Sequence, residues 1–363
     1  MTFKVVSVVG IRPNFVKLAA LHPMLSKRFD HLTVHTGQHY DYEMSKAFFE
    51  DLSIPDPDYN LGVGSGSHGY QLGEVVKRTE GILLKEAPEL VVVYGDGNST
   101  LGGALAAVKL HIPTAHVEAG YRSFDMSMPE EINRVLTDHS SNLLLAPTKS
   151  ALENLKAEKV RGKVHQTGDV MVDVLLKYMV LARKTSPKLK ELGQDPGDYI
   201  LVTIHREKNT EKESLRRIVG AIASLRDYNF VFPMHPRTRK LLKSFGMIEK
   251  LEHASNIKIT EPMNYLDFVN IEANASKILT DSGGVQKEAY VIGVPCITVR
   301  RNTELVETVR EGWNVLVGDN PDAIRKSVRE FLPRSRKKRV SLGKGDSAIR
   351  TSNILAEFVK RGR

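Results

Sequence analysis

Short apolar runs alternate along the whole chain with longer segments of helical periodicity. The apolar runs are hydrophobic at successive positions, as in Val91-Val92-Val93, rather than at every second position. This pattern is typical of parallel β-strands whose two faces are both covered by helices. It predicts strands at residues 3–9, 31–35, 89–94, 112–117, 142–146, 163–166, 199–204, 229–233, 257–259, 277–280, 294–298 and 314–317.

The segments between the strands carry apolar residues three or four positions apart, which indicates amphipathic helices. An alternation of strands and helices predicts an α/β fold with doubly wound parallel sheets. Because the alternation occurs twice, we expect two Rossmann-like domains that face a cleft. The predicted helices cover residues 14–27, 42–51, 69–86, 99–110, 130–139, 148–157, 169–184, 211–226, 236–244, 264–274, 284–292, 321–331 and 347–361.

The length of the chain also favours two domains. With 363 residues it exceeds the roughly 250–300 residues that one hydrophobic core organises. We place a first domain at residues 1–167 and a second at 168–346. A terminal helix at 347–363, which no strand follows, is free to pack back on the first domain.

Composition excludes several classes of protein. Hydrophobic residues make up 41% and charged residues 26%, as in ordinary globular proteins. No apolar run approaches the roughly 18–20 residues of a membrane span, and the N-terminus lacks the apolar region of a secretory signal. We therefore expect a cytoplasmic protein without membrane contact. Cys296 is the one cysteine, which excludes an internal disulfide and a cysteine-based zinc cage.

The net charge of +9 is concentrated near the C-terminus. Residues 322–363 carry 13 basic and 4 acidic residues, and the rest of the chain is balanced. The densest run, at 334–339, would suit nucleic acid or an anionic surface. No aromatic residues interleave with it to stack bases. We interpret it as a solvated segment before the last helix and do not expect nucleic acid as a partner.

Open α/β sheets bind ligands just beyond the carboxyl ends of their strands, so the residues after each predicted strand are the first candidates for a site. The first strand leads into Gly10-Ile11-Arg12-Pro13-Asn14 and then a helix. An arginine at a helix N-terminus is well placed for an anion such as a phosphate. A surface arginine at a helix cap is the other interpretation of this segment.

Three carboxylates are expected at one rim of the first sheet. Asp96 and Glu118 directly follow apolar strands, and Glu131 begins a helix. Carboxylates gathered in one place can act as general acid and base when their environments separate their pKa values. For Glu131, the alternative is that it only favours the helix N-terminus electrostatically.

The second half contains two histidines at strand ends, His205 and His235. Its clearest motif is 280–288, where a strand ends, Ser282-Gly283-Gly284 follows, and a helix begins. Backbone N–H groups in such a turn suit a diphosphate, and Glu288, one turn further, suits ribose hydroxyls. An ordinary N-capped helix with Ser282 as its cap is the alternative.

A glycine-rich loop at 64–69 matches the dinucleotide-binding spacing. No convincing strand precedes it, and it opens the third helix of the chain rather than the first. A lone match of this kind is weak. We interpret the loop as a connection and not as a cofactor site.

Taken together, these segments resemble the UDP-N-acetylglucosamine 2-epimerase family, which has the two-domain glycosyltransferase-B architecture. The resemblance runs in order over nearly the whole chain. The shared motifs are Gly10-Ile11-Arg12-Pro13, residues 36–41, Gly95-Asp96, residues 116–123, 129–134, 203–207, 281–288 and 314–318.

The resemblance implies a reaction and roles for individual residues. The family inverts C2 of the sugar in UDP-GlcNAc by eliminating UDP to a bound 2-acetamidoglucal and adding it back, without metal or other cofactor. The acid/base candidates are then Asp96, Glu118 and Glu131, with His205 beside the diphosphate. The substrate-binding residues are Arg12, Lys17, Arg134, Ser282, Gly283, Gly284, Glu288 and Arg300.

The family has hydrolysing and non-hydrolysing members, and in the latter a second UDP-GlcNAc activates the enzyme. The positions that resemble those for the second molecule favour the non-hydrolysing type. They are Gln38, His39, Gln71, Arg206 and His235. Members are commonly homodimers, so the resemblance implies a homodimer here.

The chain departs from the family pattern beside the carboxylates. Ile11 and Asn14 replace threonine and glutamate, Gly97 replaces threonine, and Leu305-Val306 replaces Arg-Pro. These changes leave open a related substrate, such as a UDP-linked 2,3-diacetamido uronic acid, and a hydrolysing reaction. A glycosyltransferase of the same architecture and a non-catalytic nucleotide-sugar sensor are the rival functions.

Overall fold

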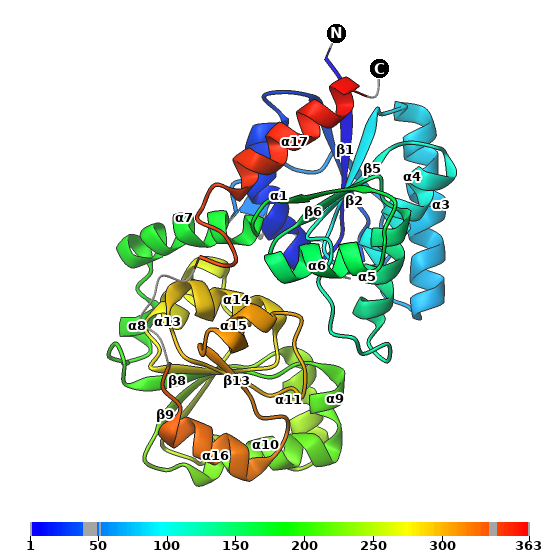
Figure 1. Cartoon of the computed structure of the whole chain (residues 1–363). Coiled ribbons are helices and arrows are strands. Elements are labelled where there is room, and N and C mark those ends of the chain that lie inside the picture. The colour runs from blue at the N-terminus through cyan, green and yellow to red at the C-terminus, as the bar shows by residue number, and fades with distance from the viewer. Residues whose placement is uncertain (1, 39–48, 51, 334–339, 362–363) are drawn as a thin grey trace. The chain divides into compact units, whose positions relative to one another are not determined.

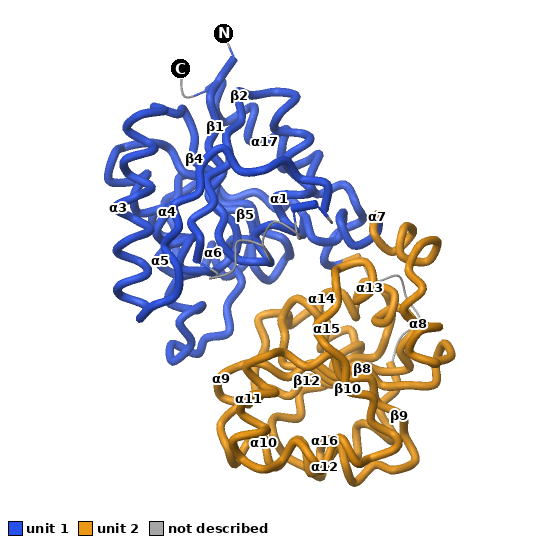
Figure 2. Tube along the Cα trace, turned by 180° about the vertical axis from the view of Figure 1, so that it is seen from behind, with its two compact units in different colours: residues 1–176, 341–363 blue, residues 177–340 orange. Residues whose placement is uncertain are grey.

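The computed structural model describes residues 2–38, 49–50, 52–333 and 340–361. The chain forms two compact units, residues 1–176 with 341–363 and residues 177–340 (Figure 2). These limits differ from the expected ones at 167 and 346 because helix α7 (Val170–Thr185) begins in the first unit. The Asp169 N–H donates to the Leu342 carbonyl, and the Asp173 carboxylate accepts from the N–H groups of Ser347 and Ala348.

Unit 1 is built on a parallel seven-stranded sheet of order β3-β2-β1-β4-β5-β6-β7 (Figure 1). Its strands are β1 (Lys4–Val9), β2 (Asp30–His35), β3 (Tyr59–Asn60), β4 (Leu90–Tyr94), β5 (Thr114–Val117), β6 (Leu143–Ala146) and β7 (Lys163–Gln166). Its helices are α1 (Arg12–Leu25), α3 (His68–Glu86), α4 (Asn98–Lys109), α5 (Pro129–Ser140), α6 (Lys149–Ala157), the first part of α7, and α17 (Ser347–Arg361). Helix α17 packs against α1, so the C-terminal helix belongs to this unit.

Unit 2 is built on a parallel six-stranded sheet of order β10-β9-β8-β11-β12-β13. Its strands are β8 (Tyr199–Thr203), β9 (Asn229–Pro233), β10 (Ile257–Thr260), β11 (Lys277–Thr280), β12 (Cys296–Thr298) and β13 (Asn314–Leu316). Its helices are α8 (Lys188–Glu191), α9 (Glu207–Thr210), α10 (Lys212–Ser224), α11 (Pro236–Ser244), α12 (Ile248–Glu252), α13 (Tyr265–Ala273), α14 (Gly283–Ile292), α15 (Val306–Arg310) and α16 (Pro321–Glu330).

Strand β8 shows why these strands are apolar at successive positions. Ile200 and Val202 belong to the hydrophobic cluster on one face of the sheet. Tyr199 and Leu201 belong to the cluster on the other face. Helices therefore cover both faces, so successive positions from Tyr199 to Val202 are apolar, and the polar Thr203 comes only at the end of the strand.

The predicted elements are found with their ends within two residues, apart from the helix at 42–51. Most of that helix lies outside the described residues, as does the basic run at 334–339. Strand β3, which has two residues, was not predicted, and neither were the short helices α8, α9, α12 and α15. In the part of the chain that the structure describes, no helix has the length and apolarity to cross a membrane.

A half-buried histidine in unit 1 makes stability depend on pH. His31 on β2 packs against His22, with their ring centroids 5.1 Å apart, and its Nε2 lies 2.8 Å from the Ser7 hydroxyl. Burial, and secondarily the neighbouring His22, lowers the pKa of His31 from 6.5 to about 3. Below about pH 6.5 the unfolded chain therefore binds a proton that the folded chain rejects.

We expect the free energy of unfolding to fall as the pH drops from about 6.5 toward 3. The contribution of His31 is at most about 1.4 kcal/mol per pH unit. His31→Gln should make this slope shallower, whereas His165→Gln, at an exposed position on β7, should leave it unchanged. Urea unfolding at about pH 7 and pH 5 measures the slopes, and equal slopes for the His31 variant and the wild type would contradict the assignment.

Candidate active site

The order of the strands places three turns of unit 1 side by side. Strand β1 lies next to β4, and β4 next to β5, with all three strands parallel. The strand order reverses between β1 and β4, and crevices for ligands form at such a switch point. The segments that begin at Gly10, Gly95 and Glu118 therefore emerge together at one edge of the sheet.

The turn after β1 is held by an asparagine. The Asn14 Oδ1 accepts from the N–H groups of Gly10 and Ile11, at 3.2 and 3.3 Å. Its Nδ2 donates to the carbonyl of Tyr94, at the end of β4, at 2.7 Å. This places Arg12 at the start of α1, where burial lowers the pKa of its guanidinium below its usual range.

Lys17 and Glu118 form a buried ion pair in the same place. The Lys17 Nζ contacts Glu118 Oε2, and the side chain of Glu118 is 12% exposed. A Cβ placed on Gly95 would lie 2.5 Å from the Lys17 Nζ, so the ammonium group lies directly over this turn. Glu118 itself has a left-handed backbone, with φ of +77°. Such a conformation costs a non-glycine residue about 1–3 kcal/mol and is common at functional sites.

Asp96 and Glu131 share one guanidinium group. Arg134 on α5 contacts Asp96 Oδ2 through NH2 and Glu131 Oε2 through NH1, the latter at 2.9 Å. Asn133 fixes the same turn by donating to the carbonyl of Asp96 at 2.9 Å. The three predicted carboxylates thus lie at the ends of β4 and β5 and on α5, each beside a cation of the same unit.

The three carboxylates differ in access and in hydrogen bonding. The side chain of Asp96 is 25% exposed, whereas that of Glu131 is 1% exposed. Glu131 accepts from the N–H groups of Ser123 and Phe124, at 3.0 and 2.8 Å, besides its contact with Arg134. Glu131 therefore does more than favour a helix N-terminus, since it holds the chain that follows Arg122.

Gln38 and Gln71 are connected to the turn of Asp96. The Gln71 Nε2 donates to the carbonyls of Gln38 and Gly64, and its Oε1 accepts from Asn98 at 2.8 Å. Asn98 in turn accepts from Asn133 at 3.2 Å. His39, predicted alongside them, lies outside the described residues.

Unit 2 repeats the arrangement at its own switch point, between β8 and β11. Asp281, which follows β11, is fully buried and accepts from the N–H groups of His205 and Arg206 at 3.0 and 2.9 Å. Asn209 donates to the same carboxylate at 3.1 Å. The ring of His205 lies 3.3 Å from Asp281 through Nδ1 and faces the ring of His235 at 5.9 Å. The structure thus gathers His205, Arg206 and His235.

The turn after β11 exposes the N-terminus of α14. Ser282 is the N-cap and accepts from the N–H of Val285 at 3.4 Å, so the alternative capping role is real. A Cβ on Gly283 would lie 2.5 Å from Glu304 Oε1, whereas a Cβ on Gly284 would meet only Ser282 Oγ, at 3.7 Å. Arg300 is bound to Glu304 at 2.8 and 3.3 Å. Glu304 therefore connects Arg300 to the turn after β11.

Glu288 belongs to a buried acidic cluster. It accepts from the Tyr265 hydroxyl at 3.1 Å, and burial raises its pKa to about 7. Burial, with the charge of Glu288, raises the pKa of Glu272 well above 4.5. One of the two carboxyl groups therefore carries a proton at neutral pH.

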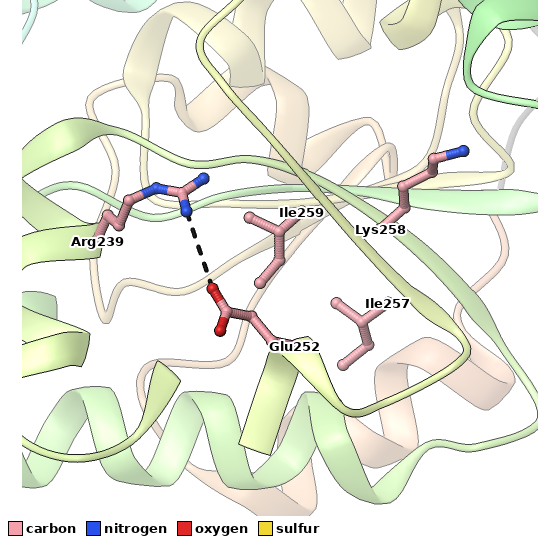
Figure 3. Close-up of a pocket in the computed structure, with 5 residues that line it drawn as sticks. All are labelled: Arg239, Glu252, Ile257, Lys258 and Ile259. Atoms are coloured by element: carbon pink, nitrogen blue, oxygen red, sulfur yellow. Dashed lines mark ion pairs between the residues drawn. The ribbon is translucent and has the colours of Figure 1, made fainter. Parts of the chain in front are cut away.

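A surface pocket of about 320 Å³ lies elsewhere in unit 2, at the edge strand β10 (Figure 3). Arg239 and Glu252 line it and form an ion pair at 4.0 Å, and Lys258 beside them donates to the Leu192 carbonyl. None of its lining residues was predicted from the sequence as a site residue, and it lies at β10, away from the switch point between β8 and β11.

Several residues that organise the two sites were missed from the sequence. They are Asn14, Asn98, Asn133, Asn209 and Asp281, and all are buried polar residues within four positions of a strand end or helix start. The available indication was a polar residue beside an apolar strand end, but the partners of these residues lie 27 to 80 positions away in the sequence.

Comparison with known proteins identifies the relatives of this chain. Residues 24–356 match the family model described as UDP-N-acetylglucosamine 2-epimerase. A UDP-N-acetylglucosamine 2-epimerase homolog of Methanococcus maripaludis is 51% identical over 97% of this chain and 99% of its own. A UDP-2,3-diacetamido-2,3-dideoxy-D-glucuronate 2-epimerase of Pseudomonas aeruginosa is 42% identical over 98% of this chain and 100% of its own.

A solved structure is also similar. It is the UDP-GlcNAc 2-epimerase of Methanocaldococcus jannaschii in complex with UDP-GlcNAc and UDP, with a TM-score of 0.92 and 46% identity over 98% of this chain and 99% of that one. The predicted fold class, α/β with two parallel sheets of the glycosyltransferase-B kind, is confirmed.

Proposed function

The chain belongs to the UDP-N-acetylglucosamine 2-epimerase family, and we propose that it interconverts UDP-GlcNAc and UDP-ManNAc by inverting C2 of the sugar. The observation that carries this proposal is the set of three carboxylates, Asp96, Glu118 and Glu131, gathered with Lys17 and Arg134 at the switch point of one sheet. Inversion at a carbon that bears hydrogen needs one group to take a proton and another to deliver one. Carboxylates beside cations suit both tasks.

Unit 2 holds the nucleotide in this proposal. The backbone N–H groups of Ser282-Gly283-Gly284 and the N-terminus of α14 favour a diphosphate. His205, fixed by Asp281, lies at the neighbouring strand end and serves the same diphosphate. Glu288 accepts hydrogen bonds from ribose hydroxyls when it is ionised.

Unit 1 carries out the proton transfers. One carboxylate takes the C2 proton while the C1–O bond breaks and its electron pair leaves with UDP, which gives a 2-acetamidoglucal. A second carboxyl group protonates C2 from the opposite face, and the diphosphate oxygen of UDP re-forms the bond to C1. Asp96 and Glu118 are the more accessible of the three, and Glu131 holds Arg134 and the chain at 123–124.

Arg12, Lys17 and Arg134 neutralise the substrate and keep the carboxylates in place, whereas Arg300 acts through Glu304. We propose the non-hydrolysing reaction, without metal or other cofactor. The residues assigned to a second, activating UDP-GlcNAc are Gln38, His39, Gln71, Arg206 and His235. The link from Gln71 through Asn98 and Asn133 to the turn of Asp96 supports this assignment. We further propose a cytoplasmic homodimer.

Product analysis tests the reaction. Incubation with UDP-GlcNAc is expected to give an equilibrium mixture of UDP-GlcNAc and UDP-ManNAc, which chromatography separates. Free ManNAc released with UDP would contradict the non-hydrolysing assignment. Turnover of a UDP-2,3-diacetamido uronic acid, with UDP-GlcNAc untouched, would contradict the substrate and favour the reaction named for the Pseudomonas relative.

A further inference from the structure

A buried histidine lies directly behind the turns that carry Asp96 and Glu118. His116 is the third residue of β5 and is 0% exposed. Its Nε2 is 2.7 Å from the carbonyl oxygen of Gly95, and its Nδ1 is 2.6 Å from Asp138 Oδ1. A carbonyl oxygen only accepts hydrogen bonds, so Nε2 must carry a proton.

The second ring nitrogen also faces an acceptor. Burial raises the pKa of Asp138, but with His116 and Arg122 beside it the pKa is held below 3.8. Independently of His116, Asp138 Oδ2 accepts from the N–H of Gly120 and contacts the guanidinium of Arg122, as an ionised carboxylate does. Asp138 is therefore an ionised carboxylate, which has no proton to donate. Both ring nitrogens of His116 then donate, and the ring is an imidazolium cation.

Asp138 passes the connection on to the turn after β5. Its Oδ2 accepts from the N–H of Gly120 at 3.0 Å and contacts Arg122 NH1 at 2.8 Å. Arg122 binds Glu158 through two hydrogen bonds, at 2.7 and 2.8 Å, and His139 lies 3.2 Å from Glu158. Positive and negative charges therefore alternate along this network of unit 1, in the order His116, Asp138, Arg122 and Glu158.

The network joins two turns whose left-handed backbone conformations depend on support from the surrounding structure. Gly95 and Gly120 have φ of +70° and +85°, and Glu118 has φ of +77°. A Cβ on Gly120 would lie 2.3 Å from the carbonyl oxygen of Ala151, so this turn fits closely over α6. A left-handed non-glycine residue persists only where its surroundings fix it. The hydrogen bonds to Gly95 and Gly120 supply that constraint on either side of the pair Asp96 and Glu118.

We infer that His116 is a positioning residue for the epimerase reaction, a buried imidazolium that fixes the turn of Asp96 directly and the turn of Glu118 through Asp138. This inference rests on the proposed function. The cation also lies among the charged groups of the site, namely Lys17 on α1, Asp96 after β4, Glu118 after β5, and Arg134 and Asp138 on α5. Its positive charge favours the ionised form of a nearby carboxylate, which is the form in which the base takes the C2 proton.

Two substitutions separate the two hydrogen bonds. His116→Gln keeps an N–H near the position of Nε2, toward Gly95, and His116→Asn keeps one near Nδ1, toward Asp138. Both remove the charge. Each variant is expected to lose about 10- to 100-fold in kcat, within the range of a misplaced catalytic group, with KM and UDP affinity changed less than about threefold.

The pH profile distinguishes this role from a purely structural one. Loss of the cation should move the acidic limb of the kcat profile upward, by about half to one pH unit, because the carboxylates then hold their protons more tightly. His31→Gln is the matched control, a half-buried histidine at the opposite end of the same sheet, and should leave the profile of kcat unchanged.

The protonation of the ring can be measured without any assay of turnover. Nitrogen-15 NMR of the wild type at about pH 7.5, where a free histidine is mostly neutral, should show both ring nitrogens protonated, with the His116 signals assigned from their absence in His116→Gln. A neutral tautomer at that pH, or wild-type kcat and pH profile in both variants, would overturn the inference. Failure of the wild type to epimerise UDP-GlcNAc would contradict the proposed function and leave the NMR result to decide on the imidazolium.

Discussion

Replacing Glu118 by glutamine is expected to lower kcat by about 10²–10⁴-fold, the range that one general acid or base supplies. The amide has nearly the shape of the carboxylate and can still accept from Lys17, so the turn should keep its structure. It cannot take up or deliver the C2 proton. The affinity for UDP should stay within about threefold of the wild type, because that binding is assigned to unit 2. Steady-state kinetics and calorimetric titration with UDP measure the two quantities.

Asp96→Asn should behave in the same way, since Arg134 keeps an acceptor at this position. Glu153→Gln is the matched control. It changes an exposed glutamate on α6 of the same unit, where the pair with Lys149 is a surface contact, and should leave kcat unaltered. A kcat for Glu118→Gln within threefold of the wild type would remove that residue from the mechanism.

The second large effect is expected from a charge placed at the N-terminus of α14. Gly284→Asp should weaken UDP binding by at least about 100-fold, since close like charges cost several kcal/mol and each 1.4 kcal/mol is about tenfold. The fold should tolerate the change, because a Cβ at this position meets nothing closer than 3.7 Å. An aspartate in the first turn also favours the helix electrostatically.

Gly284→Asn separates charge from size. The asparagine side chain has the same shape and no charge, so its loss of UDP affinity should stay below about tenfold. Thermal unfolding of both variants checks that the unit remains folded. Equal affinities for UDP in the two variants would show that the turn does not hold the diphosphate.

The fold was predictable because the strands carry an unambiguous pattern. In β4 and β8 every residue is buried, so apolar side chains lie on both faces of the sheet. Helices of ordinary length separate the strands. Strand β3 was not predictable, since two residues give no periodicity. The short helices α9 and α15 were missed for the same reason, because neither completes two turns.

The residues of the candidate site were predictable where a polar or charged side chain comes one or two positions after the end of a strand. Asp96, Glu118, His205 and Ser282 were found by this rule. Asn14 and Asn133 were not, because their importance lies in hydrogen bonds to backbone groups that only the folded chain brings near. Asp281 follows β11 directly and lay in the motif 280–288, but its hydrogen bonds to the N–H groups of His205 and Arg206 were not predicted. His116 was part of a motif but gave no sign of its role, which depends on Asp138, 22 residues later. Arg300 stays a predicted substrate-binding residue, and its ion pair with Glu304 was not predicted.

The central claim is that carboxylates of unit 1 exchange the proton at C2 of the sugar. Proton NMR of the wild-type protein with UDP-GlcNAc in D₂O tests it most directly. The account predicts that UDP-ManNAc forms with deuterium at C2 and that the remaining UDP-GlcNAc gains deuterium at the same carbon. UDP-ManNAc that retains the original C2 proton would contradict it.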